Sequence, residues 1–251
     1  MSYTLDELKE TDARIPDLAG WDFSRMKTER DPVPWDYGQL LRRLIGDNDR
    51  VLDQGTGGGE VLLHVAPICR EITGIDLDQH MIDQANRNLT ASDRTNVTFI
   101  CMDSDAMDFA DEEFDVAINR HSGFIPKETS RVIKPGGYFI TQQVGSRNCE
   151  SVFAGFEWSQ SFPDDWSISL RDQGAQFEES GMRIVGLAEY SVNWWIKDVE
   201  SLVFWLRSVP TPAPFDLEIH WQGINVLCDT ILDDRGFRTH EHRELLIAQK
   251  S

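Results

Sequence analysis

The sequence has few of the features that mark metal-binding, secreted or membrane-spanning proteins. It contains only 4 cysteines, and no two of them form a Cys-x-x-Cys pair, which disfavours a zinc site. No apolar run approaches the roughly 20 residues needed to cross a bilayer. Residues 1–10 are polar and acidic, unlike a secretory signal. We therefore expect a cytoplasmic protein with no metal and no membrane partner.

Basic residues are also scarce. Lys and Arg total 24 against 43 Asp and Glu, which gives a formal net charge of −19. An acidic surface of this kind repels phosphate backbones. The one adjacent basic pair, Arg42-Arg43, falls inside a helical pattern. We therefore do not expect nucleic acid as a partner, while a homodimer stays open.

The 251 residues include 40% hydrophobic and 27% charged side chains, an ordinary globular balance. We interpret residues 1–251 as a single domain. From residue 50 onward, apolar runs alternate with helical patterns, among them a helix at 59–68 and another that begins behind an N-cap at Asp78. This alternation predicts a parallel sheet with right-handed crossovers, its strands at 51–53, 71–76, 97–102, 114–119 and 138–144.

The chain has a different texture after Gly145. A helix is expected at 167–180, and strands at 183–190 and 242–248. The long segment between those strands, residues 191–241, contains helical patterns at 199–208 and 217–232. We expect it to cap a substrate site together with N-terminal helices in residues 1–46. Six of the 8 tryptophans lie beyond residue 150, where they suit either an aromatic acceptor pocket or a core.

Residues 51–59 read Val-Leu-Asp-Gln-Gly-Thr-Gly-Gly-Gly and are the most informative stretch. An apolar run ends at Asp53, and the glycines that follow can adopt backbone angles closed to other residues. A loop of this kind after a parallel strand builds a crevice for a nucleoside cofactor. The dinucleotide fingerprint G-x-G-x-x-G is not met, because its third glycine position holds Glu60. A carboxylate there opposes a pyrophosphate, which disfavours a nicotinamide-dependent oxidoreductase.

Five segments in order resemble the class I S-adenosylmethionine-dependent methyltransferases: 51–59, 74–78, 102–106, 114–116 and 131–137. S-adenosylmethionine has no phosphate and carries an ammonium and a sulfonium, which an acidic loop suits. The resemblance implies an α/β, Rossmann-like, doubly wound sheet. It also implies seven strands, mostly parallel with an antiparallel last strand, plus a helical cap or insertion. Segments 183–190 and 242–248 would be strands six and seven.

The resemblance and the charges also assign the cofactor-binding residues. Asp53 faces the ammonium, and the backbone of the glycine loop holds the methionine end. Asp76 binds the ribose hydroxyls unless it is only a helix-capping acid, and Asn119 closes the floor near the sulfonium. Three residues are assigned to adenine. Leu77 packs on the ring, Asp103 accepts from the amino group unless it is a solvated loop acid, and the Ser104 backbone meets a ring nitrogen. The glycine loop itself is formed by Gly55, Thr56 and Gly57.

Methyl transfer is a direct displacement and requires no protein nucleophile, so orientation supplies most of the acceleration. His121, directly after the fourth strand, is the candidate general base, or else a structural histidine. Arg120 either binds an anionic substrate or faces solvent. Residues 119–122 differ from the Asn-Pro-Pro-Tyr type associated with base methylation. We therefore predict methyl transfer to a small molecule; an RNA or tRNA methyltransferase and a non-catalytic S-adenosylmethionine-binding protein are the alternatives.

Overall fold

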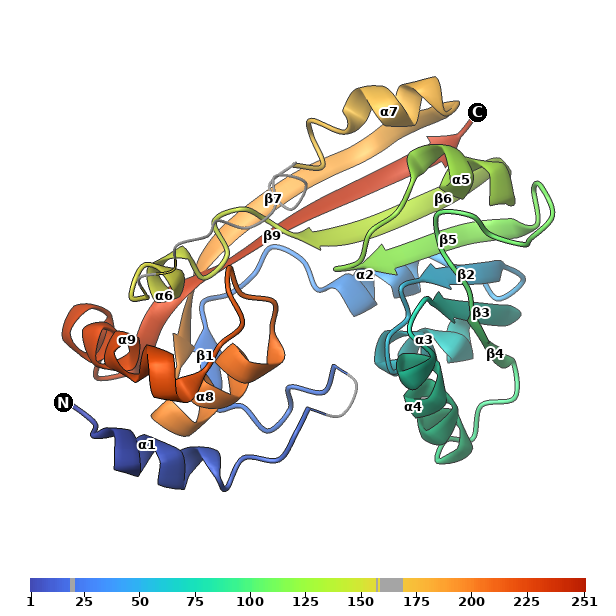
Figure 1. Cartoon of the computed structure of the whole chain (residues 1–251). Helices are drawn as coiled ribbons and strands as arrows, with labels where there is room; N and C mark the ends of the chain where they lie inside the picture. The colour runs from blue at the N-terminus through green and yellow to red at the C-terminus, as the bar shows by residue number, and fades with distance from the viewer. Residues whose placement is uncertain (19–20, 157, 159–168) are drawn as a thin grey trace.

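The computed structural model describes residues 1–18, 21–156, 158 and 169–251. These residues contain one sheet with the order β1-β7-β9-β6-β5-β2-β3-β4, and β8 pairs with β9 at its side (Figure 1). The strands are β1 Thr28–Arg30, β2 Arg50–Gln54, β3 Glu71–Asp76, β4 Val97–Cys101, β5 Phe114–Arg120, β6 Ile133–Val144, β7 Met182–Ile196, β8 Leu232–Asp233 and β9 Gly236–Lys250. The helices are α1 Leu5–Asp12, α2 Tyr37–Leu44, α3 Glu60–Val65, α4 Gln79–Thr90, α5 Pro126–Val132, α6 Glu150–Phe153, α7 Gly174–Glu179, α8 Val199–Ser208 and α9 Leu217–Thr230, with a 3-10 turn at Ala66–Ile68.

The five strands from β2 to β6 pair in parallel, as the alternating pattern predicts. β9 runs antiparallel between β6 and β7, so the expected antiparallel last strand is confirmed. The sheet is larger than the seven strands expected, because β1 and β8 add two short ones. They span 3 and 2 residues, too few to show a period-two pattern in the sequence.

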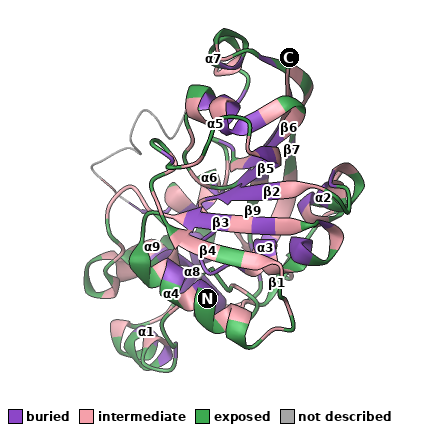
Figure 2. Cartoon of the chain, turned by 90° about the vertical axis from the view of Figure 1, so that its right-hand side faces the viewer, coloured by how far each residue is buried: buried purple, intermediate pink, exposed green. Residues whose placement is uncertain are grey.

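Helices cover both faces of the parallel strands. Val51 and Ile118 point to one face, where they pack with α2 and α3. Leu52 and Phe139 point to the other face and pack with α5 and α7. Because successive strand residues face opposite sides, each central strand contributes to both cores. Figure 2 shows buried residues along β2 and β3 in the middle of this layer.

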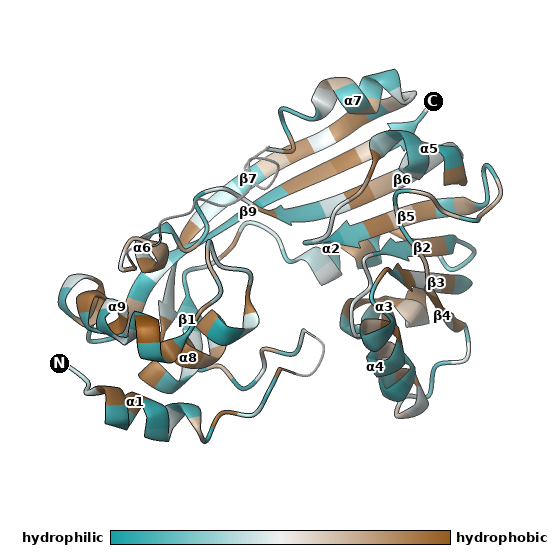
Figure 3. Ribbon diagram, in the orientation of Figure 1, coloured by the Kyte–Doolittle hydropathy of each residue, from teal (hydrophilic) through white to brown (hydrophobic). Residues whose placement is uncertain are grey.

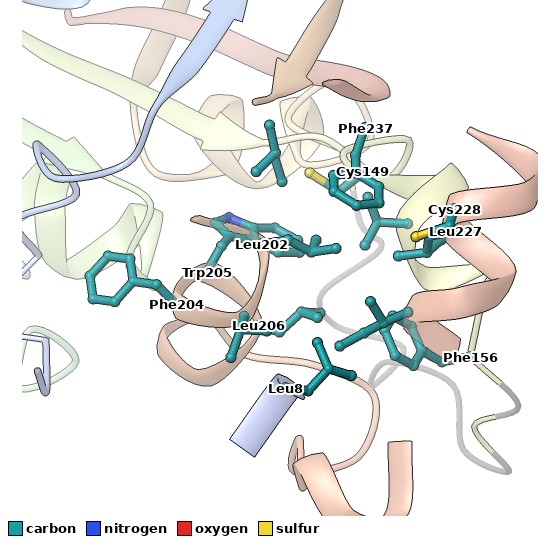
Figure 4. Close-up of a cluster of buried hydrophobic side chains, with 14 of the residues drawn as sticks. Leu8, Cys149, Phe156, Leu202, Phe204, Trp205, Leu206, Leu227, Cys228 and Phe237 are labelled. Atoms are coloured by element: carbon teal, nitrogen blue, oxygen red, sulfur yellow. The ribbon is translucent and has the colours of Figure 1, made fainter. Parts of the chain in front are cut away.

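A third core lies at the far end of the long strands. β7 and β9 have 15 residues each, and at about 3.3 Å per residue each is about 50 Å long. Their distal ends, with β1, support α1, α6, α8 and α9 around a separate apolar cluster (Figures 1 and 4). Figure 3 shows hydrophobic residues on these helices as well as on the central strands. We call this part the distal region and the part built on β2–β6 the parallel region.

The predicted boundaries of the insertion were wrong. Residues 191–196 continue β7 and residues 236–241 continue β9, so the intervening segment spans only residues 197–235. Polar residues such as Asn193 hid these strand ends, but pairing between β7, β9 and β1 extends them. The helical patterns at 199–208 and 217–232 are confirmed as α8 and α9, the second ending at Thr230.

Two further expectations need correction or limits. Residues 1–46 do not consist of cap helices alone, since they include β1, and α2 packs on the sheet. Of the helix expected at 167–180, residues 167 and 168 lie outside the described residues, residues 169–173 are not helical, and the helix α7 spans only Gly174–Glu179. Whether the α8–α9 segment caps a substrate stays a prediction.

The described tryptophans after residue 150 lie mainly in a core rather than in a pocket. Trp205 is buried in the distal cluster, and the partly buried tryptophans that pack against that cluster are Trp158, Trp194 and Trp221. Trp195 is 4% exposed, and its Nε1 donates to Asp233. Trp166 lies outside the described residues. Their large apolar surfaces are buried together because that removes the most area from water.

Candidate cofactor and acceptor site

The glycine loop turns from β2 toward the end of β3. Gly55, Gly57 and Gly59 have φ of +72°, +54° and +78°, a region that side chains disfavour. The N–H groups of Gly55 and Thr56 both donate to the Ile75 carbonyl at 2.9 Å. A Cβ on Gly55 would lie 2.1 Å from Ser122 Oγ. The loop therefore needs glycine at this position both for its backbone angles and for the approach of the segment after β5.

Asp76 holds this loop from the tip of β3. Its Oδ2 accepts from Gly57 N at 2.8 Å, and its Oδ1 accepts from Asp78 N at 3.0 Å. The N-cap of α4 is Asp78, as predicted, and its carboxylate accepts from His80 N. Asp76 is therefore not the residue that caps the helix. The structure brings it directly against the glycine loop.

Asp53 is almost fully buried, with 3% of its surface exposed. Its Oδ2 accepts from Thr56 Oγ1 at 2.8 Å. Burial, together with the nearby charges of Asp76 and Glu60, raises the pKa of its carboxyl to about 7, against the opposing effects of Thr56 and Arg120. A buried acid with this pKa gains from a cationic partner, because the partner favours the ionised form.

The residues assigned to adenine follow β3 and β4. Leu77 is 71% exposed, an apolar side chain with open space for a ring to pack on. Asp103 is exposed and accepts from Asp105 N at 2.9 Å, while Ser104 is half-buried. β3 and β4 are parallel neighbours, with Asp76 opposite Cys101. The structure therefore gathers the predicted methionine, ribose and adenine residues at one edge of the sheet.

Asn119 differs from the other predicted site residues. It is fully buried, and its amide nitrogen donates to the carbonyls of Gln54 at 2.9 Å and Gly123 at 3.4 Å. Its carbonyl oxygen accepts from Thr141 and Gln143. These bonds use its full hydrogen-bonding capacity within the protein and tie the end of β5 to β2 and β6. A contact with the sulfonium stays a prediction.

A cavity of about 380 Å³ opens beside the loop, on the face that α2 and α3 cover. Glu60 and His64 line it from α3, and Trp35 lines it from the segment before α2. Three arginines, Arg30, Arg120 and Arg243, also line it, with Gln142, Tyr190 and Glu241. Sequence reasoning identified only Arg120 of this group. Glu241 and Arg243 stand in a polar stretch of the sequence, between Arg238 and Glu244, so no local pattern singled them out.

Arg120 and His121 occupy different positions relative to this cavity. Arg120 is exposed, lines the cavity, and has neither a hydrogen bond nor an ion pair with any described residue. His121 has a φ of +58° and is exposed as a whole residue, but its Nε2 lies 3.4 Å from Nε2 of Gln142. Desolvation of the ring, followed by the charges of Arg243 and Arg120, holds the pKa of His121 well below its usual range. Its imidazole is therefore neutral at pH 7.

One cluster among the described residues has the composition of a metal site. Ligand atoms of Glu189, His242 and Glu244 lie within 4.8 Å of one another. The guanidinium of Arg147 lies 3.5 Å from His242 Nε2 and 3.7 Å from Glu189. Because a positive charge already occupies this position, the cluster is accounted for as an ion-pair network, and we assign no metal role to it.

No helix within the described part of the chain combines the length and the apolar composition that a membrane span requires.

The chain is similar to known methyltransferases in sequence. Residues 51–137 match a family model described as a methyltransferase domain. A sterol 4-C-methyltransferase of Caenorhabditis elegans is 33% identical over 114 residues, which cover 41% of this chain and 34% of that protein. A ribosomal protein L11 methyltransferase of Geobacillus thermodenitrificans is 31% identical over 111 residues, which cover 42% of this chain and 35% of that protein. The chain thus spans about a third of the length of these relatives.

The fold is also found among solved structures. A structure from Bacillus halodurans, described as a putative methyltransferase, superposes with a TM-score of 0.61 at 19% identity and covers 85% of this chain and 98% of that one. Sheet order and strand direction define a doubly wound α/β fold, with a glycine loop and carboxylates at the ends of its parallel strands. Within this fold, residues 51–137 match a methyltransferase domain.

Proposed function

We propose that this chain transfers a methyl group from S-adenosylmethionine to a small-molecule acceptor. The observation that carries the proposal is the set of carboxylates at three neighbouring parallel strands, Asp53, Asp76 and Asp103, around a phosphate-disfavouring glycine loop. Glu60 adds a fourth acid at the start of α3. These groups fit a ligand that has an ammonium, a sulfonium and ribose hydroxyls but no phosphate. When bound, that cofactor supplies an electrophilic methyl group.

The carboxylate of Asp76 has two tasks in this proposal. Each of its oxygens already accepts one backbone N–H and keeps a further lone pair. It can therefore accept from ribose hydroxyls while it continues to hold the loop. Asp53 and Glu60 attract the ammonium, Leu77 packs on the adenine, and Asp103 accepts from its amino group. Binding in this way orients the reacting carbon, which is the main contribution a protein makes to a displacement.

A small acceptor is supported by the cavity beside the loop. Its volume of about 380 Å³ lies within the range of about 300–1,000 Å³ typical of small-molecule pockets. The net charge of −19 disfavours RNA as the acceptor. The relative named for a sterol is consistent with a small acceptor, whereas the relative named for ribosomal protein L11 keeps protein methylation as a rival. His121 is the proposed general base for an acceptor that begins protonated.

Calorimetry with S-adenosylhomocysteine tests the cofactor site. We expect Asp76→Ala to weaken binding by about tenfold or more, because charge-assisted hydrogen bonds to the ribose are lost. Asp83→Ala, on the exposed side of α4, is the matched control and should bind like the wild type. Circular dichroism checks that both variants fold.

Three results would contradict parts of this proposal. Equal affinity of Asp76→Ala and wild type would mean that the ribose site is misplaced. If the wild-type protein binds NAD but not S-adenosylhomocysteine, S-adenosylmethionine is excluded as the cofactor. Binding without turnover of any acceptor in a small-molecule panel would favour the non-catalytic alternative.

A further inference from the structure

The cavity beside the glycine loop gathers three arginines in a protein that is otherwise acidic, although Asp36, Glu60 and Glu241 also line it. Arg30 comes from β1, Arg120 from the end of β5 and Arg243 from β9, and all three line the cavity. The chain has 43 acidic residues against 24 basic ones, so carboxylates to pair with these arginines are abundant. Three guanidinium groups on one small cavity therefore need an explanation.

Glu241 is the acid that faces these arginines, and its oxygens are already engaged. Its Oε1 accepts from Arg30 Nη1 at 2.8 Å and from the Tyr190 hydroxyl at 2.6 Å. Its Oε2 lies 3.8 Å from Arg243. One carboxylate is thus shared by two guanidinium groups and a phenol. The Arg120 side chain has no hydrogen bond or ion pair with any described residue, so its charge is not paired with any of the three acids that line the cavity, Asp36, Glu60 and Glu241.

Arg243 is held in a fixed direction. Its Nη1 donates to the Asn148 side chain at 2.5 Å and to the His242 carbonyl at 2.8 Å, and its side chain is 16% exposed. Burial and the charge of Arg120 both act to lower the pKa of Arg243, against the acid Glu241. The two guanidinium groups therefore repel each other across the cavity, and an anion between them would relieve that repulsion.

The position of Arg120 relates this charge to the methyl-donor site. Arg120 directly follows Asn119, which lies opposite Gln54, the last residue of β2 before the glycine loop. The positive charge of Arg120 lowers the pKa of Asp53 and so opposes the effect of burial. Glu60, next to that loop, also lines the cavity. The cavity is thus acidic where it meets the loop and basic toward β9.

Aromatic rings form another part of the wall. Trp35 and Tyr190 meet edge to face with their ring centroids 4.6 Å apart. The indole Nε1 of Trp35 donates to Gln142 Oε1 at 3.0 Å, which holds both side chains in place. A planar or apolar body packs well on such rings, and Arg binds carboxylate and phosphate through paired N–H groups.

We propose that the acceptor carries a carboxylate or phosphate group, which Arg120 and Arg243 bind, while its body packs on Trp35 and Tyr190. This inference rests on the proposed function and specifies the substrate class of the same site. It also predicts where the methyl group goes on the molecule: to an atom on the side away from the anionic group, toward Asp53 and Glu60.

Three probes that share one ring test the proposal: benzoate, phenyl phosphate and benzamide, titrated into protein saturated with S-adenosylhomocysteine. We expect one of the two anions to bind at least about tenfold more tightly than the neutral amide, and their ranking distinguishes carboxylate from phosphate. Arg120→Gln should lose about tenfold in affinity for that anion and nothing for benzamide. The Arg120 side chain has no partner among the described residues, so we expect its replacement to leave the fold intact.

Arg87→Gln is the matched control, because Arg87 is an exposed arginine on α4 whose side chain donates to Gln84. It should bind both anions like the wild type. Equal binding of anions and amide, or equal losses in Arg87→Gln and Arg120→Gln, would overturn the inference. The affinity for S-adenosylhomocysteine, measured first in every variant, separates this failure from failure of the proposed function. A wild type that binds the nucleoside but not the anions contradicts only the acceptor class.

Discussion

The parallel region and the distal region are built by different kinds of contact. In the parallel region, each strand pairs with a strand that is close in the chain, and connecting helices pack on the faces between them. In the distal region, β1 at residues 28–30 pairs with residues 194–196, and Tyr3 bonds in both directions with Asn225. Local patterns describe the first region well, whereas the second depends on segments about 170 or more residues apart.

The cavity lies where these two regions meet. Glu60 and Arg120 belong to the parallel region, while Arg30 and Trp35 belong to the segment that leads from β1 into α2. The nucleoside residues come from the parallel region alone. We infer from this division that the parallel region determines which cofactor binds. The junction with the distal region determines which acceptor binds.

The largest expected effect tests whether the two regions are separate folding units. Phe139 in the parallel region and Phe237 in the distal region are both fully buried. We expect Phe139→Ala and Phe237→Ala each to cost about 3–5 kcal/mol of stability. Because β7 and β9 pass through both regions, urea should unfold each variant in one transition. Two separate transitions would show that the regions fold independently, and Ile219→Ala, at an exposed site, is the control.

The next effect concerns His121, which directly follows β5 and lies beside Gln142 of β6. General-base catalysis typically contributes 10²–10⁴-fold, so His121→Ala should slow transfer by about a hundredfold. Affinity for S-adenosylhomocysteine should not change, because His121 has no assigned cofactor contact. His80→Ala, an exposed histidine on α4, should keep full activity. Full activity in His121→Ala would instead make this residue structural.

The smallest expected effect is a pH dependence of cofactor affinity, and it involves a residue of the parallel region alone. The pKa of Asp53 is raised to about 7, so its carboxyl is neutral below that pH and ionised above it. Affinity for S-adenosylhomocysteine, which carries an ammonium, should therefore rise as pH increases from 6 to 8. Calorimetry on Asp53→Asn should give a flatter profile. Identical affinities at pH 6 and pH 8 in the wild type would contradict the ammonium contact.

Asp53 should also affect stability without ligand, in the opposite direction. Its folded pKa lies above the unfolded value of about 3.9, so the folded state binds more protons between these values. The contribution of Asp53 to the free energy of unfolding is therefore largest at low pH and falls as the pH rises toward 7. The same carboxylate thus makes the empty site less stable at the pH where it binds cofactor better.

Local sequence patterns predicted the parallel region and the placement of the residues proposed to bind the cofactor. The strand over 71–76, the N-cap at Asp78 and the gathering of Asp53, Asp76 and Asp103 follow from hydrophobic period, capping chemistry and the rule that parallel strands end at one edge. Each of these depends on residues within a few positions of each other. The same reasoning missed the ends of β7 and β9, because polar residues there are stabilised by distant strand partners.

Only the tertiary structure decided what surrounds the acceptor. Arg30, Trp35, Arg120 and Arg243 converge because strands from opposite ends of the chain become neighbours in one sheet. Asn119 is an internal hydrogen-bonding residue for the same reason, since Gln54 meets it from β2, and Thr141 and Gln143 meet it from β6. Periodicity and capping act over one or two turns of chain, whereas the charge of a cavity is a sum over side chains that only folding brings together.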